Sequence, residues 1–271
     1  MPRFALIGYG AITEELAGCI ERCGELEMLL AVLVRPQRLA EARGKAAGRF
    51  AVVDRLEALI ELAPAVVAEC AGHGAMRQYA PALLAHGIDV ICSSVGVLAD
   101  REFEAQVAKA SADGGGRLWI PSGAVAGIDG LLAARTAGLN EVTYTSIKPP
   151  AAWDGTPGEH LLVGAAREAR TAFFEGSARE AATQYPQNAN VGATVSLAGL
   201  GLDRTKVRLV SDPSTTGPLG IIEAAGGFGR MRFEILAYAS PRNPKTSLLT
   251  AHSLYVAVRE GICFVARLGK P

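Results

Sequence analysis

The stretch Phe4–Thr13, FALIGYGAIT, decides the fold of this 271-residue chain. An apolar run of strand length leads into two glycines, and apolar residues at helical spacing follow them. In a dinucleotide-binding fold, the first such glycine makes a tight turn, and the second lets the backbone approach a pyrophosphate at the N-terminus of the next helix. An ordinary strand–turn–helix joint is the alternative. The residues expected to contact the dinucleotide here are Gly8, Gly10, Ala11 and Ile12.

Outward from this stretch, short apolar runs alternate with helical patterns as far as Pro121. The expected strands are 4–8, 28–34, 49–53, 65–69, 89–93 and 117–121, and the expected helices are 11–23, 38–47, 56–62, 76–86 and 101–113. Strands joined by helices of this length form a parallel sheet that helices cover on both faces. We therefore expect an α/β fold with a Rossmann-type, doubly wound parallel sheet.

The pattern changes after Pro121. Residues 122–139 are small, apolar and glycine-rich, with a helix expected from residue 127 onward. Further elements are expected as strands at 141–148, 206–211 and 230–237 and as a helix near 191–199. This mixture predicts a second domain of the α+β class. Near the C-terminus, residues 244–260 are expected to form a helix, and a short strand or tail follows it.

Composition excludes several classes of function. The 27 Lys and Arg residues balance the 27 Asp and Glu residues, so the chain lacks the positive surplus of a sequence-independent nucleic-acid binder. Its five cysteines contain no CxxC pair and predict neither a disulfide framework nor a metal site. We find no apolar run of about 18 residues that would span a membrane. We therefore expect a cytoplasmic protein without nucleic-acid or membrane partners.

The end of the second expected strand bears on the choice of cofactor. A carboxylate at this point would bind the ribose 2′-hydroxyl of NAD. The chain instead carries Arg35, which suits the 2′-phosphate of NADP or stacking against adenine. A solvated surface arginine is the alternative. The sequence thus indicates NAD or NADP as cofactor without choosing between them.

Several longer strings occur in a characteristic order along the chain. They are ECAGH (69–73), SVG (94–96), PSGAVAGID (121–129), KPPAAW (148–153), GTP (155–157), YPQNANV (185–191), LGLDRT (200–205) and NPKTS (243–247). Together they closely resemble the NAD(P)-dependent L-aspartate dehydrogenase family, and the resemblance runs nearly from end to end.

The resemblance implies a domain organisation and a reaction. It implies a dinucleotide-binding domain at 1–121, completed by a C-terminal helix within 242–271, and an α+β substrate and dimerisation domain at 122–241. It also implies a homodimer that oxidises L-aspartate to iminoaspartate. That product either hydrolyses to oxaloacetate and ammonia or enters NAD biosynthesis. The small-molecule substrate is therefore expected to be aspartate or a similar compound.

The same resemblance implies that Ala124 and Asn190 contact NAD. Ala124 is expected at the carboxyl edge of a strand, where open α/β sheets bind ligands and a small residue lets a cofactor come close. Asn190 offers both a donor and an acceptor, which suits the nicotinamide region. A helix N-cap is the alternative or additional role for Asn190.

One family motif is broken. The family carries its catalytic histidine in an N-x-H-x-I-x-x-x-G-x-F string, and the matching stretch 218–228 here reads PLGIIEAAGGF. Gly220 replaces the histidine, and Pro218 replaces the asparagine. Glycine has no side chain to transfer a proton, and loss of a general acid or base costs about 10²–10⁴ in rate. Four hypotheses follow: slow turnover of aspartate, turnover of another small amino or imino acid, dinucleotide binding without catalysis, or reduction of an unrelated aldehyde or imine.

Three further residues are candidates for the substrate side of the site. A dicarboxylate substrate needs fixed cations, and Lys148 and Lys245 each fall in a family-like string. Lys245 is expected in the first turn of the terminal helix, and the N-terminus of that helix would itself favour a carboxylate. His73 follows a strand end near the expected cofactor crevice. Solvated surface lysines and a histidine with a turn or packing role are the alternatives.

Overall fold

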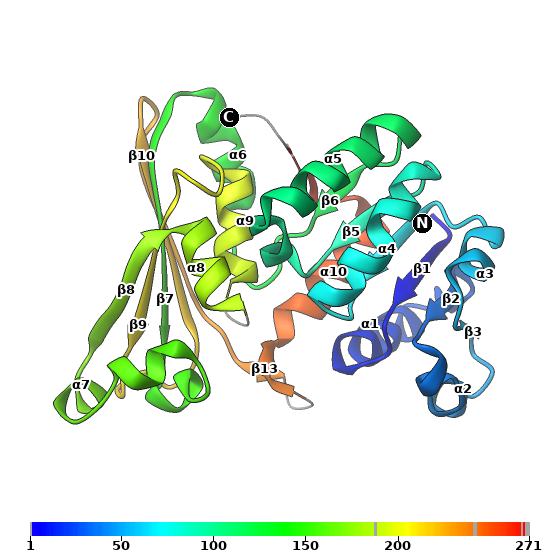
Figure 1. The fold of residues 1–271 in the computed structure, drawn as a ribbon, viewed down its shortest axis with the longest axis horizontal. Helices are drawn as coiled ribbons and strands as arrows, with labels where there is room; N and C mark the ends of the chain where they lie inside the picture. Colours follow the sequence, from blue (N-terminus) through cyan, green and yellow to red (C-terminus); the bar gives the residue numbers. More distant parts are fainter. Residues whose placement is uncertain (1, 187–188, 241–242, 267, 269–271) are drawn as a thin grey trace. The chain divides into compact units, whose positions relative to one another are not determined.

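The computed structural model describes residues 2–186, 189–240, 243–266 and 268, and for residues 239, 240 and 243–246 it describes only the backbone. The chain divides into two compact units (Figure 1). The first unit is drawn from the ranges 1–97, 101–123 and 250–270, and the second from 98–100 and 124–249. The domain limits expected from the sequence stay a prediction. None of the described helices combines the length and the apolar character needed to span a bilayer.

The first unit is built on a seven-stranded sheet of order β14-β6-β5-β4-β1-β2-β3. Its strands are β1 (Phe4–Ile7), β2 (Leu29–Leu33), β3 (Ala51–Val53), β4 (Val66–Glu69), β5 (Asp89–Cys92), β6 (Leu118–Ile120) and β14 (Phe264–Val265). All pairs are parallel except β14 with β6. The chain starts at β1, moves outward to β3, and returns to place β4 on the other side of β1. This reversal confirms the predicted doubly wound sheet.

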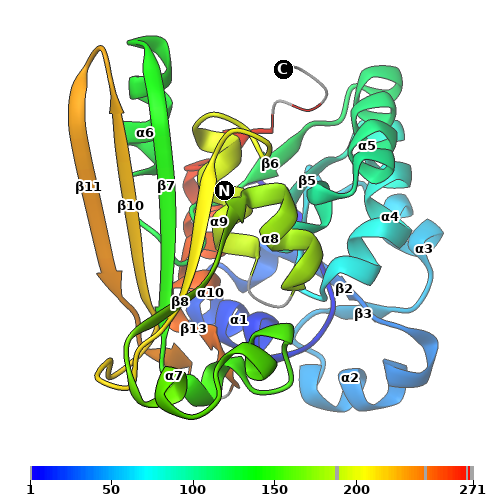
Figure 2. The same ribbon diagram turned by 60° about the vertical axis from the view of Figure 1, so that its left-hand side comes forward.

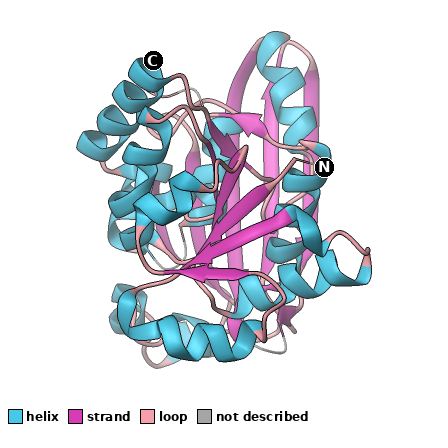
Figure 3. Ribbon diagram, turned by 90° about the vertical axis from the view of Figure 1, so that its right-hand side faces the viewer, coloured by secondary structure: helices cyan, strands magenta, loops and turns pink. Residues whose placement is uncertain are grey.

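Helices lie on both sides of this sheet (Figure 3). They are α1 (Ala11–Arg22), α2 (Leu39–Ala46), α3 (Leu56–Glu61), α4 (His73–Ala85), α5 (Arg101–Gly114) and α10 (Leu248–Glu260). Leu16 and Ile20 of α1 are four residues apart and share a buried core with β1, β2 and Leu254 of α10. α4 and α5 pack against each other. Helix α10 thus contributes to the core of the first unit, far in sequence from β1.

The second unit contains a five-stranded sheet of order β11-β10-β7-β9-β8. Its strands are β7 (Leu139–Lys148), β8 (Thr171–Ser177), β9 (Lys206–Ser211), β10 (Leu219–Gly226) and β11 (Gly229–Leu236). Only β7 and β9 pair in parallel. α6 (Ile128–Thr136), α8 (Ala178–Gln184) and α9 (Asn190–Ala198) run along one face of the sheet (Figure 2). The predicted α+β class is confirmed for this unit.

Short helices complete the connections between these elements. They are η1 (Leu26–Met28), η2 (Pro36–Arg38) and η3 (Val95–Ala99) in the first half of the chain, and η4 (Pro150–Trp153), η5 (Pro157–Leu161) and α7 (Ala165–Glu168) between β7 and β8.

The expected helix at 244–260 is wrong at its beginning. β13 (Asn243–Ser247) pairs with β12 (Ala239–Ser240), and α10 begins only at Leu248. Strand pairing takes up the backbone hydrogen-bonding groups that a first helical turn would need. The Ser247 hydroxyl then accepts a hydrogen bond from the Leu249 N–H at 3.2 Å, next to the helix start.

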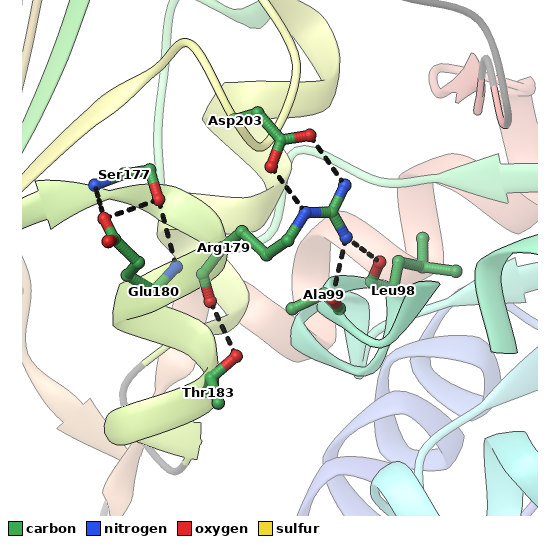
Figure 4. Close-up of polar contacts among 7 residues, drawn as sticks. All are labelled: Leu98, Ala99, Ser177, Arg179, Glu180, Thr183 and Asp203. Carbon is green, nitrogen blue, oxygen red and sulfur yellow. Dashed lines mark hydrogen bonds and ion pairs between the residues drawn. The ribbon is translucent and has the colours of Figure 1, made fainter. Parts of the chain in front are cut away.

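Segment 98–100, which belongs to the second unit, is bound by Arg179 of α8 (Figure 4). Arg179 donates from Nε and Nη2 to the two carboxylate oxygens of Asp203 at 2.7 and 3.1 Å. Its Nη1 also donates to the Ala99 carbonyl at 2.7 Å. Only 14% of the Arg179 side chain is exposed, against 50% for Asp203, so the bond to the Ala99 carbonyl is the more buried of these charge-assisted contacts.

Replacement of Arg179 by methionine should lower the free energy of unfolding of the second unit by about 1–3 kcal/mol, because Ala99 and Asp203 lose a charged donor. Urea denaturation followed by the fluorescence of the buried Trp153, in a Trp119→Phe background, measures this change. Arg232→Met is the matched control, since Arg232 pairs with two glutamates at the surface and should be replaced without measurable effect. Equal unfolding midpoints for the two variants would contradict this account.

Candidate dinucleotide and substrate site

The glycine turn between β1 and α1 has the backbone that a pyrophosphate needs. Gly8 has a φ of +90°, and a Cβ built on it would lie 2.5 Å from the Ala71 Cβ. Both the conformation and the close approach therefore require glycine. A Cβ built on Gly10 meets no heavy atom of the described residues within 4 Å, so this side of the turn is open. The residues present fit a bound phosphate group.

Helix α1 begins directly after this turn. Gly10 is its N-cap in an extended conformation, Ala11 is its first residue, and Ile12 packs against the core of the first unit. Thr13 is fully buried, and its hydroxyl donates to the Gly8 carbonyl at 2.8 Å. The residue that replaces the third motif glycine thus links the helix to the turn. The helix N-terminus carries the partial positive charge that favours an anion.

A pocket of about 470 Å³ opens beside the turn and is lined by Gly8, Gly10 and Ala71 at one end. Arg35, exposed at the start of η2, and Arg38 also line it. The described lining contains no Asp or Glu. Burial raises the pKa of Tyr79 in the same pocket, and the nearby charge of Arg35 opposes that change. Arg38 is bound to Glu41 on α2, with its Nε 2.6 Å from a carboxylate oxygen. The pocket therefore presents two guanidinium groups and, among its described lining residues, no carboxylate.

In the second unit, one face of the sheet collects the substrate-side candidates. Tyr144, Ser146 and Lys148 alternate along β7 and share a face. Ser146 lies directly opposite Gly220 on β10 and is hydrogen-bonded to Tyr144. A Cβ built on Gly220 would lie 3.3 Å from the Tyr144 hydroxyl oxygen. The structure thus places a buried phenol beside Gly220.

The titration of these side chains is shifted by burial. Burial raises the pKa of Tyr144 to about 12, although the Ser146 hydrogen bond lowers it. Burial lowers the pKa of Lys148 to about 8. The Lys148 ammonium lies over the Trp153 ring, 5.2 Å from its centroid, which favours the charged form. Lys148 can therefore change charge near neutral pH, whereas Tyr144 stays protonated there.

The remaining predicted residues are placed as follows. Ala124 lies in the turn that follows β6. Asn190 is the first residue of α9, and Ala189 is the N-cap, so the alternative capping role of Asn190 is wrong. His73 is the first residue of α4, directly after the N-cap Gly72.

Lys245 is not at a helix N-terminus. It lies within β13, and its side chain is outside the described residues, so the expected helix-end site for a carboxylate is wrong.

The cofactor candidates Gly8, Gly10 and Arg35 line one pocket of the first unit, whereas Lys148 and Gly220 share a sheet face of the second.

Sequence reasoning missed several side chains of these two sites. Arg38 follows Arg35 by three residues, and this spacing at the start of a short helix was an available signal. Tyr79 and Tyr144 gave no signal, because a tyrosine at helical or strand spacing usually belongs to the core.

One group of potential metal ligands occurs among the described residues. Single ligand atoms of Glu15, Cys19 and His252 lie within 4.8 Å of one another. The Arg22 guanidinium donates to the Cys19 sulfur at 3.1 Å and lies 3.6 Å from Glu15. A cation would have to displace this positive charge, so the group does not fit a metal site.

Two family models match the chain. Residues 8–121 match the model of the homoserine dehydrogenase NAD binding domain, and residues 129–261 match the C-terminal model of aspartate dehydrogenase. The crystal structure of aspartate dehydrogenase from Thermotoga maritima covers 96% of both chains with a TM-score of 0.72 at 24% identity. A homoserine dehydrogenase from Thiobacillus denitrificans covers 94% of this chain and 72% of its own with a TM-score of 0.59 at 13% identity. These structures support the Rossmann-type fold.

Relatives of higher identity cover nearly the whole chain. An L-aspartate dehydrogenase from Ruegeria pomeroyi is 41% identical over 258 residues, which are 95% of this chain and 92% of the relative. L-aspartate dehydrogenase 2 from Bordetella pertussis is 40% identical over 95% of this chain and 96% of its own length. Similarity of this extent, on a chain with the glycine turn of a dinucleotide site, shows that the protein belongs to the L-aspartate dehydrogenase family.

Proposed function

We propose that this chain is an NAD(P)-dependent oxidoreductase that acts on L-aspartate or on another small amino or imino acid. The observation that carries the proposal is the near full-length similarity to L-aspartate dehydrogenases. The glycine turn, which is tight at Gly8 and open at Gly10, supports it as well. In the proposed reaction, the substrate Cα loses a hydride and its nitrogen loses a proton. Iminoaspartate, the product from aspartate, then hydrolyses to oxaloacetate and ammonia or enters NAD biosynthesis.

The chain's residues have separate proposed roles. Gly8, Gly10, Ala11 and Ile12 would hold the pyrophosphate, and Ala124 and Asn190 would contact the nicotinamide half of the cofactor. The bound nicotinamide would supply the hydride acceptor. Lys148 and Lys245 would bind the substrate carboxylates, and His73 is a further candidate beside the cofactor.

Gly220 limits the proposed reaction. The family's histidine would transfer a proton at this position, and glycine cannot. Tyr144 is the nearest side chain, but a phenol with a pKa of about 12 is a poor base at neutral pH. We therefore expect slow oxidation of aspartate by the natural chain.

Restoring the histidine should restore activity. In the double variant Gly220→His with Pro218→Asn, the rate of NAD(P)H formation from aspartate should rise at least about 10-fold, because a proton-transfer group returns. Tyr144 must shift by a few tenths of an ångström to admit the new Cβ. Gly220→Ala adds the same Cβ without the imidazole and should bring no gain. Unchanged activity in a folded double variant that still binds dinucleotide would contradict the proposed role.

A dinucleotide-binding protein without catalysis is the second candidate function, and the glycine at 220 is the observation that favours it. Steady-state assays of the natural chain across small amino acids distinguish the two. Turnover of any of them supports the oxidoreductase, whereas tight dinucleotide binding without turnover supports the alternative.

The cationic pocket supports acceptance of NADP. Arg35 would pair with the 2′-phosphate, so Arg35→Ala should raise the Kd for NADPH at least about tenfold and change the Kd for NADH much less. Titration calorimetry with both nucleotides measures this difference. The control is Arg43→Ala, an exposed arginine on α2 outside the pocket lining. A parallel loss for both nucleotides would indicate stacking on adenine instead.

Lys148 should make substrate binding depend on pH. Its ammonium is charged below a pKa of about 8 and neutral above it, so affinity for a dicarboxylate should fall as the pH rises through this value. Above it, the Kd for the unreactive dicarboxylate succinate should rise about tenfold per pH unit. Lys148→Gln should remove this dependence, whereas Lys206→Gln, at an exposed position on β9, should keep it. An identical pH profile in Lys148→Gln would exclude Lys148 from the carboxylate site.

The remaining proposals concern assembly and location. The family resemblance supports a homodimer. The composition of the chain supports a cytoplasmic location.

A further inference from the structure

Glu69 is a buried carboxyl group to which the proposed reaction assigns no role. It is the last residue of β4, and its side chain is 0% exposed. Burial raises its pKa, and hydrogen bonds from Gly72, Ala71 and Ser94 oppose that shift. Buried charged groups are weak contributors to stability, because their desolvation offsets what their contacts supply. A position of this kind is therefore a candidate for a functional role.

The carboxylate of Glu69 connects two loops. Its Oε1 accepts hydrogen bonds from the N–H groups of Ala71 and Gly72, both at 2.6 Å, in the loop between β4 and α4. Ser94, in the loop that follows β5, donates two further hydrogen bonds of 3.1 Å. Its hydroxyl donates to Oε1, and its N–H donates to Oε2. The Ser93 hydroxyl donates to the main-chain carbonyl of Glu69 at 2.7 Å. One side chain thus fixes the carboxyl ends of two neighbouring strands.

The strand order identifies which part of a dinucleotide these loops would meet. Ligands of open α/β sheets bind at the carboxyl ends of the strands, where the strand order reverses. Here the reversal is between β1 and β4. The adenosine half belongs on the β2 side, where Arg35 lies, so the nicotinamide half extends over β4 and β5.

The contact between Ala71 and Gly8 joins the two loops to the phosphate turn. Ala71 lines the pocket beside the turn, and its Cβ would lie 2.5 Å from a Cβ on Gly8. Glu69 holds Ala71 through its N–H. A change in the carboxylate would therefore act on the β4 side of the turn, across β1 from the β2 side where Arg35 lies.

We propose that Glu69 is a positioning residue for the nicotinamide half of the dinucleotide: its carboxylate holds the loops after β4 and β5 at the separation that this half requires. The inference rests on the proposed function, since it assumes that the pocket binds NAD(P). A carboxylate suits this role because it accepts several N–H donors at once, and one of them is the N–H of Gly72, the N-cap residue of α4.

The variant Glu69→Gln tests this role. Its amide replaces one acceptor oxygen with a donor that faces other donors, so the loops lose their fixed separation. The Kd for NADH and NADPH should rise at least about tenfold. The Kd for AMP, which carries only the adenosine half and one phosphate, should change less than about twofold. Titration calorimetry measures all three. Ser94→Ala removes a single bond to Oε1 and should give the same pattern with a smaller rise, which keeps the test available if Glu69→Gln fails to fold.

Leu59→Ala is the control for simple loss of stability. Leu59 is fully buried on α3, outside the pocket lining, so its truncation should lower the melting temperature and leave all three affinities unchanged. An equal loss for AMP and NADH in Glu69→Gln, or a loss no larger than in Leu59→Ala, would overturn the positioning role. Failure of the natural chain to bind either dinucleotide would instead overturn the proposed function.

Discussion

The close approach of Gly8 to Ala71 is the contact on which the proposed dinucleotide site depends. The first glycine of the turn has a positive φ and no room for a side chain, because the loop after β4 lies against it. That loop is itself held by the buried carboxylate of Glu69. The turn, the loop and the carboxylate therefore form one structure at the point where the strand order reverses. A larger residue at Gly8 would separate the two central strands at their carboxyl ends.

In the second unit, strand pairing within one sheet brings the candidate substrate-side residues together. The alternation along β7 places Tyr144, Ser146 and Lys148 on a single face, and the pairing of β10 brings Gly220 opposite Ser146. Gly220 therefore lies next to the Tyr144 phenol and opposite Ser146. In the proposed reaction, Gly220 would limit proton transfer, because glycine has no side chain that could carry a proton.

The first domain could be predicted well because its signals are local. Apolar runs of strand length and helical spacing identified every strand from β1 to β6, with ends displaced by one or two residues. Strands β8 and β10 were not identified. β10 contains two glycines and two alanines, residues that form strands only when neighbours pair with them. β13 was predicted as helix for a related reason, since its pairing with β12 overrides the local pattern.

The sequence by itself determined the parallel α/β architecture, the glycine turn, the cation at the end of β2 and the absence of a histidine at 220. These features reside in single residues or in the spacing of neighbours, which the chain displays directly. Only the tertiary structure decided that Tyr144 lies beside Gly220, that Arg179 binds segment 98–100, and that Glu69 joins two loops. Each of these contacts joins residues that are far apart in the chain, and their positions depend on strand register and helix packing rather than on local sequence.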